Sequence, residues 1–140
     1  MRYVSFRRPD GTPSFGRLDG ETIVELATDT TPSLKAALTD GSLATLADGA
    51  SFAIVDVVLL PVIPDPAKIL CVGLNYAEHV KETGREQKAH PAIFVRYADS
   101  LIADGQPMVK PGVTTRFDYE GELALVIGKP CHKAAAADAW

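Results

Sequence analysis

The stretch FDYEGELALVIGK, residues 117–129, decides how the chain is interpreted. Its apolar half, residues 123–127, is predicted to form a buried strand. Two glutamates, Glu120 and Glu122, stand two residues apart at its start. Residues two apart on a strand face the same way, with backbones about 6.6 Å apart. The two carboxylates can therefore converge on one cation, although a solvated acidic strand face explains the same pair.

A divalent metal is the sharper of these two interpretations. Mg²⁺ prefers oxygen ligands and takes two or three protein carboxylates, with waters completing its shell. Asp118 shares the face but lies about 13 Å from Glu122, too far to share a metal without a bulge. A glycosidase pair is a third interpretation, which the geometry disfavours because those carboxylates must flank a sugar.

A second candidate group is His79 with Glu82, in the stretch AEHVKE. The two residues are three apart on a predicted helix and so share one face. A carboxylate beside an imidazole holds its tautomer and strengthens it as a base for water. A purely structural surface pair is the alternative. His90 and His132 have no such partner in the sequence and are expected in loops.

Composition bounds the class of protein. The 140 residues are 46% hydrophobic and 23% charged with a net charge of -4, which suits one domain, or a small domain plus part of another. The charge offers no basic surface for nucleic acid. The most apolar run is broken by Asp56 and Pro61, so no membrane span is expected, and we expect a cytoplasmic protein. Cys71 and Cys131 form no CxxC pair and are expected to be buried thiols.

The positions of glycine and proline, which favour turns and end helices, predict the order of the secondary-structure elements. Three β-prone runs separated by Asp-Gly pairs predict a three-strand meander within residues 1–26. Ser33 is expected to cap a helix that Gly41 ends, with a second helical turn after it. Three prolines in residues 61–66 place a domain boundary, giving an N-terminal module at 1–62 and a second unit at 63–140.

Beyond that boundary we expect a strand, a helix and a strand. KILCVGLNY enters a glycine turn, NYAEHVKETG is predicted to be a short helix capped by Asn75 and stopped by Gly84, and AIFVRY is a strand.

Three stretches in this order, PDPAKILCVGLNYAEHVKE, HPAIFVRYADSLI and FDYEGELALVIGK, resemble the fumarylacetoacetate hydrolase family, in its small acylpyruvate hydrolase-like branch. The resemblance runs from about residue 61 to the last residue, and the first sixty residues look like the small N-terminal module of many members. It implies an α+β, β-rich fold, in which a β-meander and helix module precedes the first part of a mixed β-barrel-like catalytic fold.

The resemblance also implies chemistry. Glu120 and Glu122 would bind Mg²⁺ or Mn²⁺, and His79 with Glu82 would activate water. Arg96 stands where the family often has Lys or Arg, and would pair with a substrate carboxylate or be an ordinary surface residue. The implied activity is cleavage of a carbon–carbon bond in a 2,4-dioxo acid of the acylpyruvate or fumarylpyruvate type, in a homo-oligomer. Decarboxylation, isomerisation or hydration by the same metal-stabilised enolate is the alternative.

One family segment has no counterpart here. The family completes its metal site with an aspartate in a stretch resembling GYTxxNDxTARDxQ, and Asp138 is not in a matching context. We therefore expect an incomplete catalytic domain. The rival function is a catalytically incomplete fragment that folds or acts only with a partner chain.

Overall fold

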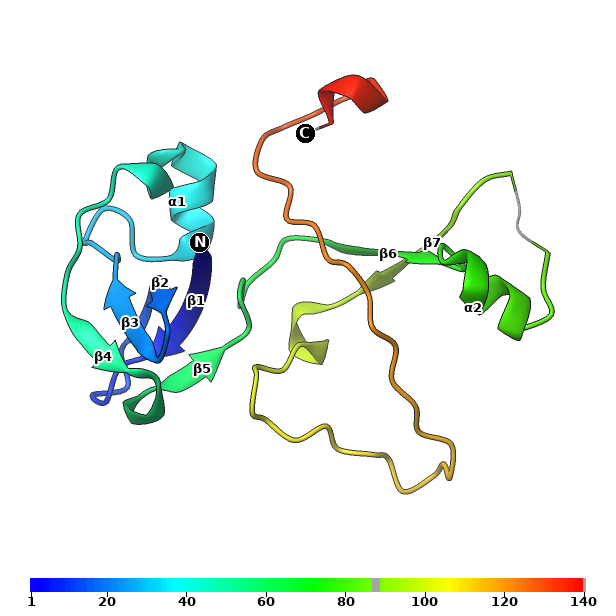
Figure 1. Cartoon of the computed structure of the whole chain (residues 1–140), viewed down its shortest axis with the longest axis horizontal. Helices are drawn as coiled ribbons and strands as arrows, with labels where there is room; N and C mark the ends of the chain where they lie inside the picture. The colour runs from blue at the N-terminus through cyan, green and yellow to red at the C-terminus, as the bar shows by residue number, and fades with distance from the viewer. Residues whose placement is uncertain (87–88, 140) are drawn as a thin grey trace.

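A computed structural model of the chain describes residues 1–86 and 89–139. Strands dominate it and helices are few and short, in agreement with the predicted β-rich class (Figure 1). The described residues form a sheet of five strands, built from the first sixty residues, and a ribbon of two strands that follows.

The first sheet is antiparallel and has the order β4-β3-β2-β1-β5. Its strands are β1 (Arg2–Arg7), β2 (Pro13–Asp19), β3 (Thr22–Glu25), β4 (Ser51–Ala53) and β5 (Val58–Leu60). The first three form the predicted meander, and Gly20 at a positive φ of 60° allows the tight turn in which Asp19 pairs with Thr22. The sequence did not predict that β4 and β5 would extend the meander on both edges.

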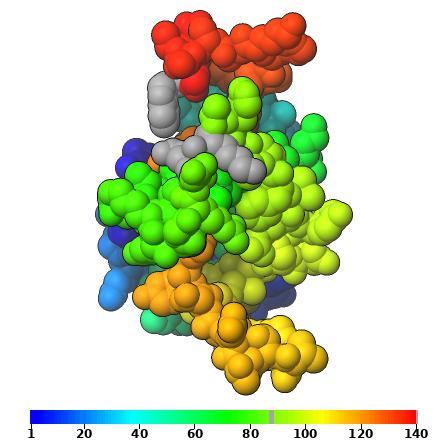
Figure 2. Space-filling view, turned by 90° about the vertical axis from the view of Figure 1, so that its right-hand side faces the viewer, coloured from blue at the N-terminus to red at the C-terminus, as the bar shows by residue number. Residues whose placement is uncertain are grey.

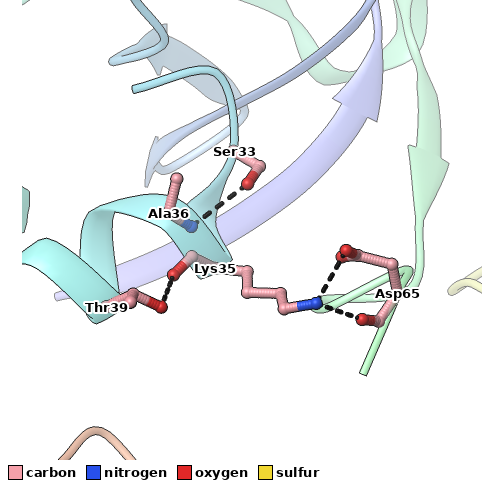
Figure 3. Close-up of polar contacts among 5 residues, drawn as sticks. All are labelled: Ser33, Lys35, Ala36, Thr39 and Asp65. Carbon is pink, nitrogen blue, oxygen red and sulfur yellow. Dashed lines mark hydrogen bonds and ion pairs between the residues drawn. The ribbon is translucent and has the colours of Figure 1, made fainter. Parts of the chain in front are cut away.

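Helix α1 (Leu34–Asp40) covers this sheet, and its limits confirm the predicted caps. The Ser33 hydroxyl oxygen accepts a hydrogen bond of 3.1 Å from the Ala36 amide (Figure 3). Gly41 ends the helix at a φ of 75°. The helix buries Leu34 and Ala37 in a cluster with two residues of the sheet side, Phe15 and Leu26.

The proline-rich residues 61–66 are attached to this N-terminal unit. The Ser5 hydroxyl donates to the Val62 carbonyl at 2.8 Å, and Ile63 packs against the core cluster. The Lys35 ammonium donates to the backbone oxygen of Asp65 at 2.6 Å and to its carboxylate at 2.8 Å (Figure 3). The division of the chain into domains at residue 62 stays a prediction, and these contacts tie the start of the second unit to the first.

The second unit contains the predicted strand, helix and strand. These are β6 (Ile69–Gly73), α2 (Ala77–Glu82) and β7 (Ala92–Arg96). β6 and β7 pair antiparallel, from Gly73 opposite Ala92 to Ile69 opposite Arg96. Single 3₁₀ turns complete the described elements: η1 (Ser42–Ala44), η2 (Ile54–Asp56), η3 (Ala98–Ser100) and η4 (Ala136–Asp138).

The predicted cap of α2 was wrong. The residue before the helix is Tyr76, at φ -101° and ψ 121°, and no side chain caps the first turn. Asn75 lies one residue too early for this role. Gly84 does stop the helix as expected, since its φ is 63° and its amide donates to the Lys81 carbonyl at 3.1 Å.

The prediction of a buried strand in residues 117–129 was also wrong. No ladder forms there (Figure 1). Its large apolar side chains, Leu123 and Ile127 among them, are exposed. A strand is stabilised by hydrogen bonds to a neighbour, and no described segment pairs with this one. Cys131 is likewise exposed rather than buried, while Cys71 is half-buried.

No helix in residues 1–86 and 89–139 is long and apolar enough to cross a bilayer.

Candidate active site

His79 lies on α2 beside Glu82, as the three-residue spacing predicted. The distance from His79 Nδ1 to Glu82 Oε2 is 3.8 Å, within ion-pair range but too long for a hydrogen bond. The His79 side chain is 38% exposed, so solvent reaches the imidazole. Val80, the next residue, is buried.

The other imidazole nitrogen faces residues 117–129, which we call the acidic segment. His79 Nε2 lies 3.3 Å from Glu120 Oε1, so the structure brings together candidate residues from two separate stretches of sequence. Figure 2 views this side of the molecule, where the green atoms of α2 lie next to orange atoms of the C-terminal half. The imidazole therefore has a carboxylate on either side.

A second contact joins the same two segments, and the sequence did not predict it. The Tyr76 hydroxyl oxygen accepts a hydrogen bond of 2.9 Å from the Leu123 amide. A tyrosine at the start of a helix has no spacing pattern that marks it as a site residue. The order NYAEH, with an aromatic hydroxyl three residues before the histidine, was the signal available.

The donors at Glu120 and Glu122 suit a hard divalent cation, because both offer carboxylate oxygens on an exposed segment. Glu120 is already directed toward His79, and Asp118 is engaged locally, since its carboxylate accepts from the Tyr119 amide at 2.8 Å. Among the described residues no three His, Cys, Asp or Glu side chains converge as a metal group. A complete shell around Glu120 and Glu122 would therefore need ligands other than the described side chains.

Arg96 lies apart from this group. It pairs with Ile69 at the end of the ribbon opposite to Gly73 and α2, about 13 Å along the strand from Ala92. Its predicted contact with a substrate carboxylate stays a prediction, as do the metal and base roles of the other four residues.

The N-terminal sheet has a charged cluster of its own. The Glu25 carboxylate is buried and accepts from Ser14 and, at 2.7 Å, from the Arg8 guanidinium. The hydrogen bond to Glu25 raises the pKa of Arg8. Arg8 and Glu25 border a hollow of about 350 Å³. Because the buried carboxylate is satisfied by its neighbours, we interpret the cluster as structural.

Two family models match this chain. The model of the fumarylacetoacetate hydrolase C-terminal domain matches residues 68–140, and the Rv2993c-like N-terminal domain matches residues 1–61. Protein Rv2993c of Mycobacterium tuberculosis is 39% identical over 92 residues, which are 65% of this chain and 34% of that protein. The mitochondrial oxaloacetate tautomerase FAHD2A of Homo sapiens is 37% identical over 84 residues, 60% of this chain and 27% of that protein.

A solved structure supports the fold. The crystal structure of a putative HpcE protein from Mycobacterium smegmatis superposes with a TM-score of 0.62 at 21% identity, over 79% of this chain and 41% of that one. The chain spans only about a third of the length of the two curated relatives named above, 34% of one and 27% of the other. Because the C-terminal domain model covers more than half of its residues, the chain belongs to the fumarylacetoacetate hydrolase family.

Proposed function

We propose that the protein containing this chain is a metal-dependent enzyme that cleaves a carbon–carbon bond in a 2,4-dioxo acid of the acylpyruvate or fumarylpyruvate type. One observation carries the proposal: the His79 imidazole lies between two carboxylates, 3.8 Å from Glu82 and 3.3 Å from Glu120. A carboxylate beside an imidazole suits a general base for water.

His79 would act through Nε2. We assign the hydrogen of the neutral ring to Nδ1, on the side of Glu82, which leaves Nε2, on the side of Glu120, as the base. Nε2 accepts a proton from a water on that side, and the resulting imidazolium is stabilised by the carboxylates flanking it. The hydroxide adds to the acyl carbonyl. The bond to the neighbouring carbon then breaks, releasing a carboxylic acid and the enolate of pyruvate, which takes up the proton.

Glu120 and Glu122 would hold Mg²⁺ or Mn²⁺, which when bound supplies positive charge to stabilise the enolate and polarise the oxo-acid oxygens. Both side chains lie in an exposed segment and are reachable from solvent. Arg96 is assigned to the substrate carboxylate, for which its fixed positive charge is suited. The substrate is a small molecule, and we propose a homo-oligomer because the apolar segments of the second unit are uncovered.

A second candidate reaction is tautomerisation of oxaloacetate. It is favoured by the similarity to a relative that bears this name, 37% identical over 84 residues. That reaction needs a proton to be removed from the carbon beside the carbonyl and returned to oxygen, and His79 can perform the removal without a hydrolytic water. A decarboxylase, isomerase or hydratase would use the same enolate.

Products distinguish the two reactions. The protein is incubated with Mg²⁺ and acetylpyruvate, and the products are followed by proton NMR. In a separate assay it is incubated with oxaloacetate, whose enol absorbance is followed. Acetate and pyruvate in equal amounts, with one oxygen of acetate derived from ¹⁸O-labelled water, support hydrolysis. Rapid loss of the enol absorbance of oxaloacetate without loss of any carbon, and no acetate from acetylpyruvate, favours the tautomerase. No turnover of either compound would leave the partner-dependent fragment as the better account.

A further inference from the structure

Two side chains of one short stretch contact two points of the acidic segment. Tyr76, at the start of α2, accepts from the Leu123 amide at 2.9 Å. One turn further along, His79 Nε2 faces Glu120 Oε1 at 3.3 Å.

The two contacts run in opposite chain directions. From Tyr76 to His79 the chain advances three residues, while from Leu123 to Glu120 it goes back three. Two contacts at separate points restrain both the translation and the rotation of one segment relative to the other. A single contact would fix neither.

The two attachments differ in kind. The hydroxyl of Tyr76 is carried by a rigid ring with few rotatable bonds, and it accepts from a backbone amide. The contact of His79 joins two mobile side chains, and the carboxylate of Glu120 is 63% exposed. An exposed pair of this kind is weak on its own. The tyrosine contact is therefore the one that keeps the segments in register.

We propose that Tyr76 is a positioning residue, which holds α2 against residues 120–123 so that the imidazole of His79 faces Glu120. The catalytic consequence rests on the proposed function, whereas the contact does not. Its catalytic effect would arise through His79, since Tyr76 itself is not assigned to the reacting atoms.

The contact is tested by amide hydrogen exchange, resolved to single residues, in Tyr76→Phe. The change removes one oxygen and keeps the ring. We expect the Leu123 amide to exchange at least about threefold faster. The amide of Val80, which donates to the Tyr76 carbonyl at 3.0 Å inside α2, should be unchanged. Tyr119→Phe is the matched control, because Tyr119 lies in the same segment and is 83% exposed.

The positioning role is tested by a double-mutant cycle on turnover. Tyr76→Phe should lower kcat about 10- to 100-fold with KM little changed, because a misplaced base slows the step without weakening binding. In the His79→Ala background the same change should cost nothing further, since the residue that it positions is gone. A residue that only stabilises the fold would lower both backgrounds equally.

Each outcome decides a separate point. Equal exchange of Leu123 in Tyr76→Phe and in the unchanged protein would overturn the proposal. So would full additivity of Tyr76→Phe with His79→Ala. If the unchanged protein turns over none of the keto acids, the proposed function is rejected. The exchange of the Leu123 amide then decides by itself whether Tyr76 holds the two segments together.

Discussion

His79 Nε2 and Glu120 Oε1 lie 3.3 Å apart, although the two residues belong to separate sequence motifs. Glu82 lies on the other side of the ring, with its Oε2 3.8 Å from Nδ1. The pairing of a helix residue with the acidic segment is what turns two ambiguous sequence patterns into one candidate site.

Replacing the base tests the role of His79. His79→Ala should still bind metal and a dioxo-acid analogue, while kcat falls about 10²- to 10⁴-fold, the usual effect of losing a positioned base. Glu82→Gln should lose less, because it keeps a polar group beside Nδ1. His90→Ala, in an exposed stretch, is the control. Steady-state kinetics on acetylpyruvate measure these effects, and unchanged turnover in His79→Ala would remove the base from the mechanism.

The uncovered apolar segment should cause self-association. Leu123, Leu125 and Ile127 are 76%, 63% and 74% exposed. An exposed apolar segment with unpaired backbone groups associates readily with other chains. Sedimentation velocity of the 140-residue chain should show oligomers that Leu125→Lys reduces. Val55→Lys, at a site on the first unit that is 85% exposed, should leave them unchanged. A monodisperse monomer of the unmodified chain would contradict this prediction.

The cap of α1 should be measurable in stability. Ser33→Ala removes the acceptor of the Ala36 amide and should lower the free energy of unfolding by about 1 kcal/mol. Thr30→Ala, whose exposed hydroxyl contacts Thr28 at 3.2 Å, is the control. Urea denaturation followed by circular dichroism gives both values, and equal losses would show that the cap contributes nothing of its own.

Acid should weaken the N-terminal sheet through Asp48. A hydrogen bond from the Arg17 guanidinium lowers the pKa of this carboxyl, with contacts of 2.9 and 3.0 Å. Because the folded pKa lies below the unfolded one, of about 3.9, the stabilisation is complete above pH 5 and is lost as pH falls through the folded pKa.

Asp48→Asn should therefore lower Tm at pH 7 by a small amount, since the pair is exposed, and flatten the dependence of Tm on pH below about 4. Glu21→Gln serves as a charge-matched control. A steeper acid dependence in Asp48→Asn would show that the pair is not the cause.

Local signals predicted the local structure of this chain. Ser33, Gly41 and the Asp-Gly turns each act on neighbouring residues, so sequence alone located α1 and the meander. The segment 117–129 has the composition of a strand, but a strand depends on a partner, and the described residues provide none. Composition could not reveal this.

The candidate site divides in the same way. The pairing of His79 with Glu82 follows from helical spacing. The contacts of His79 with Glu120 and of Tyr76 with Leu123 join residues far apart in sequence, 47 positions in the second case. Such contacts depend on how the chain folds back and leave no periodic pattern to detect.

The central claim is that Glu120 and Glu122 hold the divalent cation on which cleavage depends. It is tested most directly by the turnover of acetylpyruvate against Mg²⁺ concentration, for the unchanged protein, Glu120→Gln, Glu122→Gln and the control Glu21→Gln. We predict that a strong chelator abolishes turnover and that each site variant needs at least about tenfold more Mg²⁺, with only partial recovery in excess. Full turnover in chelator, or site variants that match the control at every Mg²⁺ concentration, would contradict the account.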